Sequence, residues 1–377
     1  MKYRLLFFTF FLLFVSCGKD NSNENIIPDP SKTGEVPPSI TAMTATCFYG
    51  STVVITGTNF SPNVAENVVK FDDINATVTQ ATSTSLTVTA PNLAGAPAAD
   101  VTVTRSGVVS NSKNIAVDVD QNKVATYTWT THSVKPGVTY KTGQFSLFGT
   151  SLRRIHILDI TLNAENTLGI GVATSHKATV AICNDYNAVA GVNAGYFPLG
   201  GARDKDPYIR IDGKTVQNGH LGVSQLFTNS ALLINNNVAT VRKFTDSGTN
   251  LNQVAAVIPP SQAQNIIVCG PMLITDGSIE DLNMSQSHNS SSTGRTGLGV
   301  VEDGTRVFMV VIDYNGDVMG VSTLQLAKIL QALGAVDAMN LDGGGSSTMF
   351  VENMGESGRV SNNTYSQRSV KSVIYVK

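Results

Sequence analysis

One carboxylate and three hydroxyls flank a run of three glycines between Asn340 and Thr348. Glycine lacks a Cβ atom, so the backbone there can approach another strand or a ligand closely. Asp342 stands directly before the glycines, which would bring a carboxylate, backbone N–H groups and small donors together. Such a set of groups suits an anion or a sugar ring. The alternative is a tight turn in which Asp342 caps its own backbone.

The glycine run does not have the sequence of a common nucleotide- or calcium-binding loop. No Lys follows it, as in a P-loop, and no Gly-x-Gly-x-x-Gly opens a helix after it. The acidic or amide residues at alternating positions, with a later Glu, that define an EF-hand are also absent from the sequence.

A second carboxylate is expected close to the first. The apolar strand pattern of residues 307–312 ends at Asp313, and the buried strand pattern of residues 335–339 leads to Asp342. If the two strands are parallel neighbours, a single crossover places both carboxylates at the same edge of the sheet. This edge is then a candidate site.

The crossover itself is predicted to be an amphipathic helix between residues 322 and 334. Ser322 and Gln325 have the spacing of a capping box, and Gly334 is placed to end the helix. Apolar residues recur at i, i+3, i+4 and i+7 and form one buried face: Leu326, Ile329, Leu330 and Leu333.

Two more polar residues adjoin predicted strands. Asn193 follows the buried pattern of residues 188–192, and its amide would either cap a turn or bond a sugar hydroxyl. Residues 284–294 are rich in Ser and Asn and predict a loop of low order, which leads to Arg295 at the start of a strand.

Length and composition predict two domains without a nucleic-acid partner. The chain has 377 residues, a net charge of −2 and 14% charged residues, with no basic patch. Its 42% hydrophobic content permits well-packed cores, and the abundance of Thr, Val, Gly and Asn favours strands and turns over long helices.

Histidines and cysteines do not have the spacing of a transition-metal site. No cofactor is expected, and a requirement for a divalent cation stays open. At most one disulfide is predicted, between Cys183 and Cys269, with Cys47 left over.

Residues 1–17 have the pattern of a lipoprotein signal peptide. A basic start and a short apolar run lead to Val15-Ser16-Cys17-Gly18, which resembles a lipoprotein cleavage box. Cys17 is therefore the expected lipidation site, and the alternative is a plain secretory signal. No Asp follows Cys17, so retention at the inner membrane is not signalled. We expect a lipid-anchored protein of the cell envelope, on the periplasmic or surface-facing side of the outer membrane.

The next segments divide into a tether and two domains. Residues 18–36 are polar and predict a flexible tether. Residues 37–118 show short alternating strands separated by turns, the pattern of an all-β sandwich, and at Gly57-Thr58-Asn59-Phe60 they resemble the IPT/TIG immunoglobulin-like family. A polar joint at residues 119–123 leads to an α+β domain with a mostly β core, expected over residues 123–377.

The second domain resembles the phosphodiester glycosidase family, which includes the mammalian uncovering enzyme that removes N-acetylglucosamine from phosphomannose. The matching segments, in order, are residues 192–197, Gly270-Pro271, Arg295-Thr296, Asp313, Gly320 and residues 340–349. The chain departs from the family pattern at Ala194, Tyr196, Tyr314-Asn315, Gln367 and Ser369. The replacement of an Arg by Asn315 and of a Glu by Gln367 concerns contacts to the phosphate or the group beyond it.

The resemblance implies hydrolysis of the bond between a sugar anomeric carbon and phosphate, for example in an alpha-N-acetylglucosamine-1-phosphodiester. A phosphate monoester is a good leaving group, so a strong general acid is less needed than for a simple glycoside. Asp342 or Asp313 would act as base or nucleophile, and Arg295 would grip the phosphodiester bidentately. The expected substrate-binding residues are Asn193, Gly195, Asn340, Gly343, Gly344, Gly345, Ser346, Ser347 and Arg368.

Two other functions remain open on the sequence. One is a lipid-anchored glycan-binding protein with an inactive catalytic domain, which would not need Asp313, Asp342 and Arg295 together. The other is an adhesin that works through its immunoglobulin-like module. The expected partners are a glycan or glycoconjugate carrying a sugar phosphodiester and, through the lipid, a membrane.

Overall fold

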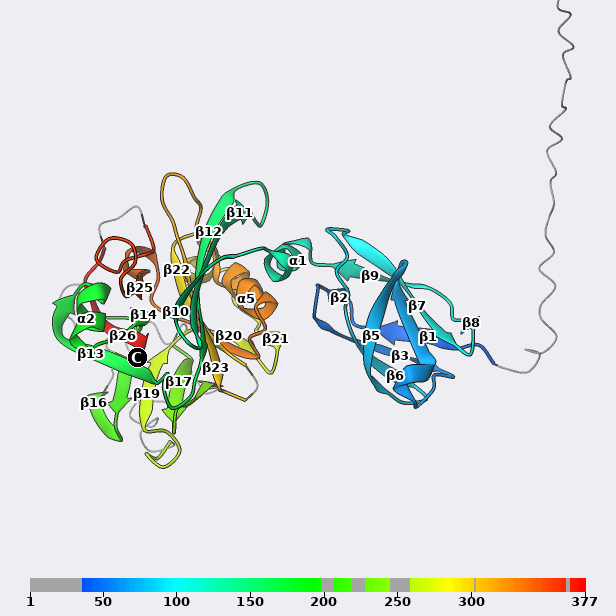
Figure 1. Cartoon of the computed structure of the whole chain (residues 1–377), viewed down its shortest axis with the longest axis horizontal. Coiled ribbons are helices and arrows are strands. Elements are labelled where there is room, and N and C mark those ends of the chain that lie inside the picture. Colours follow the sequence, from blue (N-terminus) through cyan, green and yellow to red (C-terminus); the bar gives the residue numbers. More distant parts are fainter. Residues whose placement is uncertain (1–35, 198–206, 219–227, 245–257, 302, 364–366) are drawn as a thin grey trace, which may run out of the picture.

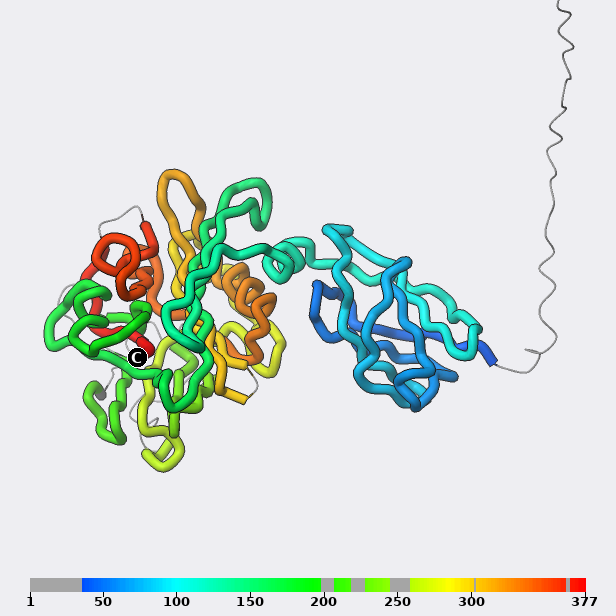
Figure 2. The backbone as a smooth tube through the Cα atoms, in the orientation of Figure 1, coloured from blue at the N-terminus to red at the C-terminus, as the bar shows by residue number. Residues whose placement is uncertain are grey.

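The computed structural model describes residues 36–197, 207–218, 228–244, 258–301, 303–363 and 367–377. An N-terminal β-sandwich and a larger C-terminal body, rich in strands with few helices, confirm the expected fold class (Figure 1). The backbone trace in Figure 2 shows that each body is formed by its own continuous part of the chain. The expected signal peptide, Cys17 and most of the tether lie outside the described residues.

The sandwich is built from strands whose side chains alternate between core and solvent. In β3 (Thr52–Thr58), Val53 and Ile55 are fully buried while their neighbours are exposed, because successive side chains point to opposite faces of a strand. The other strands here are β1 (Ser39–Met43), β2 (Thr46–Cys47), β4 (Asn67–Phe71), β5 (Ile74–Ala81), β6 (Ser85–Thr89), β7 (Ala98–Arg105), β8 (Val108–Val109) and β9 (Lys113–Val117).

The segment between the two bodies, where the sequence predicted a polar joint, is a helix. Helix α1 (Val119–Thr126) begins at Asp118, whose side chain accepts a hydrogen bond from the backbone N–H of Gln121. This N-cap satisfies one of the donors that a helix start leaves unpaired. Two of the polar residues in this helix, Gln121 and Asn122, are buried, and their side chains are hydrogen-bonded to Gln331 and to the backbone N–H of Tyr49.

An eight-stranded sheet forms the framework of the C-terminal body. Its strands lie in the order β10-β11-β12-β23-β22-β24-β20-β21. Their bounds are β10 (Thr130–Lys135), β11 (Val138–Ser146), β12 (Leu152–Thr161), β20 (Met272–Thr275), β21 (Ser278–Ile279), β22 (Arg295–Val300), β23 (Arg306–Ile312) and β24 (Asp337–Asn340).

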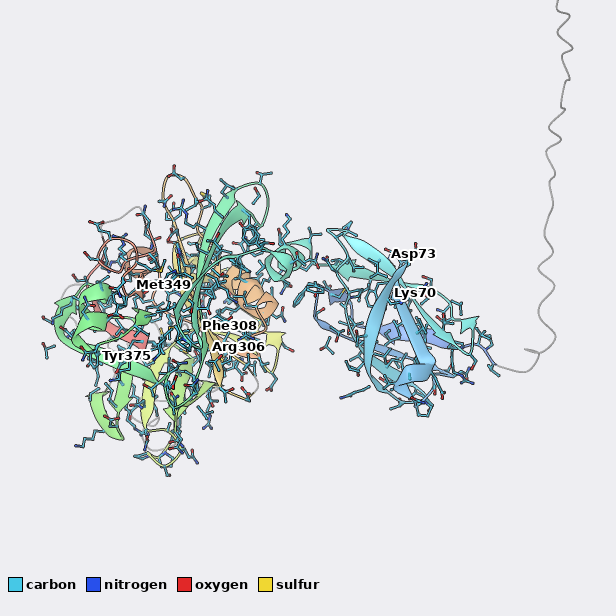
Figure 3. All side chains as sticks on the ribbon, in the orientation of Figure 1. Lys70, Asp73, Arg306, Phe308, Met349 and Tyr375 are labelled. Atoms are coloured by element: carbon cyan, nitrogen blue, oxygen red, sulfur yellow. The ribbon has the colours of Figure 1, made fainter. Side chains whose placement is uncertain are left out.

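Two smaller sheets pack against one face of this framework and share its core. One has the order β13-β26-β14-β25 and the other β16-β15-β19-β17-β18. The bounds are β13 (Leu168–Lys177), β14 (Ala190–Asn193), β25 (Met349–Val351), β26 (Val370–Val376), β15 (Tyr208–Ile211), β16 (Lys214–Asn218), β17 (Ser230–Asn235), β18 (Val238–Lys243) and β19 (Asn265–Cys269). Figure 3 labels Met349 and Phe308, which belong to the cores on the two sides of the large sheet.

Helix α5 (Thr323–Ala332) covers the other face of the large sheet. Ser322 and Gln325 form the expected capping box, and Gly334 lies beyond the helix end with φ +97°. Leu326 and Leu330 pack over Gly297 and Gly299 of β22, where a Cβ atom would lie 3.0 Å and 3.3 Å from these leucines. The glycines of β22 therefore let the helix approach the sheet closely. The described residues also include the helices α2 (Thr179–Asp185) and α4 (Ser287–Ser290), and short 3-10 turns at Val64–Glu66 and Gly344–Ser346.

The order of the strands corrects one expectation about the two carboxylates. Strands β23 and β24 are both antiparallel to β22, which lies between them. They are therefore parallel to each other but are not neighbours. Both still end at the same edge of the sheet.

The cysteines of the described residues are not cross-linked. Cys47, Cys183 and Cys269 are buried free thiols, so the pair considered for a disulfide is not joined. In the part of the chain that the structure describes, no helix is both long and apolar enough to cross a membrane.

Candidate active site

Three of the predicted residues meet at one edge of the large sheet. Asp313 follows the end of β23 and Asp342 follows the end of β24, while Arg295 begins β22. Because β22 runs opposite to both neighbours, its start lies beside their ends, with Arg295 opposite Ile312 and Gly297 opposite Asn340. The topology thus brings together residues separated by up to 47 positions in the chain.

The glycine-rich loop after β24 is fixed by its own backbone. The N–H of Asp342 donates to the Ala194 carbonyl at 2.9 Å, and the N–H of Gly344 donates to the Gly294 carbonyl at 2.7 Å. A Cβ atom on Gly343 would lie 2.9 Å from that same Gly294 oxygen, and Gly344 has φ +61°. Glycine is required here for a close approach between two backbones. The amide of Gly344 is consequently not available to a substrate.

Asn193 holds this loop and does not face a ligand. Its Oδ1 accepts hydrogen bonds from Thr296 Oγ1 at 2.8 Å and the Thr348 N–H at 3.0 Å. Its Nδ2 donates to the Asp342 carbonyl at 2.7 Å, and the residue is fully buried. These partners give Asn193 a positioning role in place of the sugar contact that the sequence suggested. Gly195 is likewise packed, since a Cβ atom there would lie 2.8 Å from Pro207.

Asp342 is the half-buried acid of the site. Burial raises the pKa of its carboxyl group from 3.8 to about 6. The Ser346 hydroxyl, the positive charge of Arg368 and the N–H of Gly343 oppose this shift by favouring the carboxylate. The Ser346 hydroxyl acts at close range but outside hydrogen-bond geometry. The result is an acid that changes charge near neutral pH, as catalytic carboxyl groups often do.

Arg368 supplies a cation beside Asp342. Its backbone N–H donates to the Gly345 carbonyl at 3.1 Å, and its side chain is exposed. A Cβ atom on Gly345 would lie 3.3 Å from Arg368 Nη2, so the guanidinium lies against the glycine loop. An exposed guanidinium at the edge of a half-buried carboxyl group is placed to receive an anion.

Several buried polar atoms around the loop have no hydrogen-bond partner in the described part of the chain. They are Asn340 Oδ1, Ser346 Oγ, Ser347 Oγ and Gln367 Nε2. Buried polar groups are rarely left unpaired, because each costs roughly 1–3 kcal/mol. Three of the four belong to residues that the sequence assigned to substrate binding. None of the four atoms has appreciable exposed surface, so a ligand would reach them only if the loop shifted.

Tyr196 and His288 also belong to this site. The sequence marked Tyr196 only as a departure from the family pattern and did not single out His288. The Tyr196 hydroxyl donates to the Gly270 carbonyl at 2.6 Å, accepts from Asn340 Nδ2 at 2.9 Å and lies 3.1 Å from His288 Nε2. Burial and the nearby Arg295 charge lower the pKa of His288 to about 4, so its ring is neutral at pH 7. These residues come from distant segments, and neither has a motif of its own.

Arg295 is bound to the protein backbone. Its Nε donates to the Val321 carbonyl at 3.1 Å, and its Nη2 donates to the carbonyls of His288 at 2.6 Å and Ser291 at 2.9 Å. The side chain is buried. A bidentate grip on phosphate would need a hydrogen of Nε or Nη2 that these carbonyls already hold, although Nη1 makes no hydrogen bond within the described part of the chain. Arg295 fixes residues 288–291, the segment for which the sequence suggested low order.

Asp313 is buried beneath the site. Its Oδ2 lies 3.1 Å from His156 Nε2 and 3.6 Å from Arg154 Nη1, while its Oδ1 accepts the Asn362 N–H at 2.8 Å. His156 Nδ1 lies 2.7 Å from the Tyr140 hydroxyl, which extends the chain of polar contacts into β11. With no exposed surface, Asp313 is not placed to contact a sugar as base or nucleophile.

The contacts of Asp313 lead to the glycine loop. Next to Asn362, the Asn363 Nδ2 donates to the Ser347 carbonyl and the Asn363 Oδ1 accepts the Tyr314 N–H at 2.8 Å. Asp313 thereby fixes the 362–363 backbone, which in turn holds the end of the loop that begins at Asp342. We assign it a positioning role.

The described residues contain no cluster of three or more His, Cys, Asp or Glu side chains that could hold a metal ion. The site contains the titrating carboxyl group of Asp342, the exposed guanidinium of Arg368, and neutral His288 and Tyr196, with unpaired hydroxyl and amide atoms buried around them. This arrangement can bind an anion next to a polyhydroxylated ring and offer a carboxylate to it.

Two family models match the chain. A phosphodiester glycosidase model matches residues 186–377, which is half of the chain and includes Tyr196, Asp342 and Arg368. An IPT/TIG domain model matches residues 38–120, which is the N-terminal sandwich. No curated protein matches the chain.

Several solved structures resemble the chain at low sequence identity. The catalytic domain of zebrafish N-acetylglucosamine-1-phosphodiester alpha-N-acetylglucosaminidase, auto-inhibited by its pro-peptide, is 19% identical, with 67% of this chain and 88% of that chain covered and a TM-score of 0.49. A putative exported protein from Burkholderia pseudomallei is 13% identical, with 91% and 98% covered and a TM-score of 0.45. A hypothetical protein from Synechocystis is 16% identical, with 90% and 80% covered and a TM-score of 0.44.

The family match extends over the whole glycine-rich edge, from Asn193 through Asp342 to Arg368, so the residues with unpaired polar atoms and the titrating acid all lie within it. The chain belongs to the phosphodiester glycosidase family.

Proposed function

We propose that the C-terminal body hydrolyses the bond between the anomeric carbon of a sugar and phosphate in a sugar-1-phosphodiester, for example an alpha-N-acetylglucosamine-1-phosphodiester on a glycan of the cell envelope. The observation that carries this proposal is Asp342, a half-buried acid whose pKa is raised to about 6, beside the exposed cation of Arg368. Family membership supports the reaction class.

Arg368 and Asp342 have separate tasks in this reaction. The Arg368 guanidinium offsets the negative charge of the phosphodiester and of the phosphate monoester that leaves. The Asp342 carboxylate acts on the anomeric carbon as nucleophile, or activates water as base. The unpaired Oδ1 of Asn340 and the Oγ atoms of Ser346 and Ser347 are buried, so they lie behind the surface of the site and are not its direct sugar contacts. Tyr196 and neutral His288 shape the same wall.

The pH dependence of the reaction tests the role of Asp342. Because the carboxylate form is the active one, kcat/KM on a sugar-1-phosphodiester should rise with pH through about 6 and then level off. The assay should include the matching simple glycoside, which lacks the phosphate and should be cleaved far more slowly. Equal rates on both substrates, or a rate that falls as the pH rises through 6, would contradict the proposal.

The competing function is a glycan-binding protein with an inactive domain. It predicts saturable binding of the phosphodiester without product at any pH. The titrating carboxyl group beside a cation favours the enzyme, because binding alone does not need an acid whose charge changes near pH 6.

We further propose that the protein is anchored by lipid at Cys17, in a segment outside the described residues. Stable anchoring requires more than one acyl chain, as a lipoprotein terminus provides. Expression of Cys17→Ala should therefore move the protein from the membrane fraction to the soluble fraction. Cys47→Ala, which changes a buried thiol of the sandwich, is the control. Unchanged membrane association of Cys17→Ala would refute the anchor.

A further inference from the structure

A cavity lies between the sandwich and the C-terminal body, away from Asp342. Its volume is about 840 Å³, which is within the range of ligand pockets. The sandwich contributes residues 44–52, α1 contributes Gln121, and the C-terminal body contributes residues 276–279 and the end of α5. Strand β20 begins at the catalytic edge and ends at Thr275, directly before the lining residues 276–277, so the cavity is at the opposite edge of the large sheet.

The floor of the cavity is a continuous set of hydrogen bonds. Gln121 Nε2 donates to Gln331 Oε1 at 2.6 Å, and Gln331 Nε2 donates to the Gly277 carbonyl at 2.7 Å. Gln121 is buried. Outside the lining, Lys328 of α5 donates to Asp118 at 2.6 Å. These contacts join α1 to α5, two helices that lie near each other in Figure 1. Gln121, Gln331 and Gly277 all line the cavity, so it has a defined floor.

The wall contributed by the sandwich combines an aromatic ring with hydroxyl groups. Tyr49 is 44% exposed at the rim. Thr44 Oγ1 accepts the Val54 N–H at 3.0 Å and Ser51 Oγ accepts the Phe48 N–H at 3.0 Å, so both hydroxyl hydrogens remain available as donors. Thr46 and Thr52 add further hydroxyls.

The lining carries little charge. Asp276 is the acid of the lining, and no described lining residue is basic. A phosphate or an acidic ligand would find no cation there, so the chemistry favours a neutral ligand. An aromatic face beside several hydroxyls suits a polyhydroxylated neutral molecule, because its C–H face packs on the ring while its hydroxyls exchange hydrogen bonds with the wall.

A peptide is less well suited to this cavity. The strands that border it, β2 and β21, are edge strands of two residues each. An added peptide strand is held by main-chain hydrogen bonds along an edge, and two-residue edges offer few of them.

We propose that the cavity between the sandwich and the C-terminal body is a second binding site, for a neutral oligosaccharide, with Tyr49 as its aromatic platform. The choice of a glycan rests in part on the proposed function, since the same chain would hold neutral sugar units of the glycan whose phosphodiester it cleaves. Binding itself does not depend on turnover, because the cavity and the catalytic edge are separate.

Titration calorimetry on the full chain with short neutral oligosaccharides of mannose and of glucose tests the proposal. The wild-type protein should bind at least one of these probes, and Tyr49→Ala should bind it about tenfold more weakly or worse, as truncation of an aromatic anchor usually causes. Tyr49→Ala should keep its kcat on a small sugar-1-phosphodiester. Ser278→Arg, which places a bulky side chain in the cavity from the opposite wall, should also weaken binding.

Two further variants separate the possible outcomes. Val68→Ala, at a 45% exposed position of β4 outside the cavity, should bind like the wild type. Asp342→Asn should keep oligosaccharide binding while losing turnover, so a failure of the proposed function is distinguishable from a failure of this site. Wild-type affinity in both Tyr49→Ala and Ser278→Arg would overturn the proposal. So would an absence of binding to every neutral probe, or binding of a peptide library in their place.

Discussion

Asp342→Asn is expected to reduce kcat/KM on a sugar-1-phosphodiester by about 10²–10⁴-fold, the range in which a positioned acid or base contributes. Asn has nearly the same shape but offers no carboxylate to the anomeric carbon. The measurement is initial rates at pH 7.5 or above, roughly a unit and a half beyond the pKa, where wild-type Asp342 is ionised. Asp317→Asn, an exposed acid on the loop after Asp313, is the matched control and should retain wild-type rates.

The same substitution should stabilise the fold at neutral pH. Folded Asp342 keeps its proton up to about pH 6, whereas the unfolded chain releases it near 3.8. The folded state therefore binds more protons between these values, and its stability falls as the pH rises through this window. Asn removes that loss, so the melting temperature of Asp342→Asn should exceed the wild-type value above pH 6 and match it below pH 4.

Two results would contradict this assignment. Near-normal rates in a folded Asp342→Asn variant would remove Asp342 from the reaction. If Asp342→Asn melts at a lower temperature than the wild type at pH 8, the Asp342 carboxylate stabilises the folded state instead of destabilising it.

Asp313→Ala is expected to destabilise the protein by about 3–5 kcal/mol, because it leaves buried partners without their carboxylate. His156 would lose its contact at 3.1 Å and Asn362 would lose the acceptor of its N–H. For a body of this size each kcal/mol lowers the melting temperature by roughly 2–4 °C, so a fall of about 6–20 °C should be measured. The 362–363 backbone would be released, and with it the end of the glycine loop at Ser347.

Asp185→Ala is the matched control. Asp185 pairs with Lys177 at 2.6 Å with 51% of its side chain exposed, and an exposed pair contributes about 0–1 kcal/mol. If Asp313→Ala melts like the wild type yet loses turnover, Asp313 contacts the substrate and the role first inferred from its position after a strand is restored. A large fall in melting temperature together with a changed KM supports positioning.

The strands and the helix that the sequence predicted correctly are those specified by short-range patterns. The alternation in residues 52–58 produced β3, since one face of a strand is buried and the other solvated. The capping box at Ser322 and the spacing of Leu326 and Leu330 produced α5. Such signals are local, because the backbone geometry of a helix or strand repeats within a few residues.

The use of each site residue was decided by tertiary structure. The sequence indicated Asp342 and Arg368 as polar residues of the site, and both lie at the glycine loop with their side chains at least partly exposed. It also indicated Asn193, Asp313 and Arg295, whose side chains are held by protein groups, in Arg295 through Nε and Nη2. Residue type and motif position do not show whether the N–H groups of an arginine already donate hydrogen bonds to backbone carbonyls.

Local sequence patterns also failed to indicate the contacts of three further residues, Tyr196, His288 and His156. Each acquires its environment from strands and loops distant in sequence: Tyr196 meets His288 across 92 positions, and His156 meets Asp313 across 157. The sequence by itself determined the two strand-rich regions, helix α5 and the glycine-rich turn with its acid. Only the tertiary structure decided which polar groups bind each other and which remain available to a ligand. Hydrogen bonds in a folded core form between segments that are distant in sequence, and no local pattern encodes those contacts.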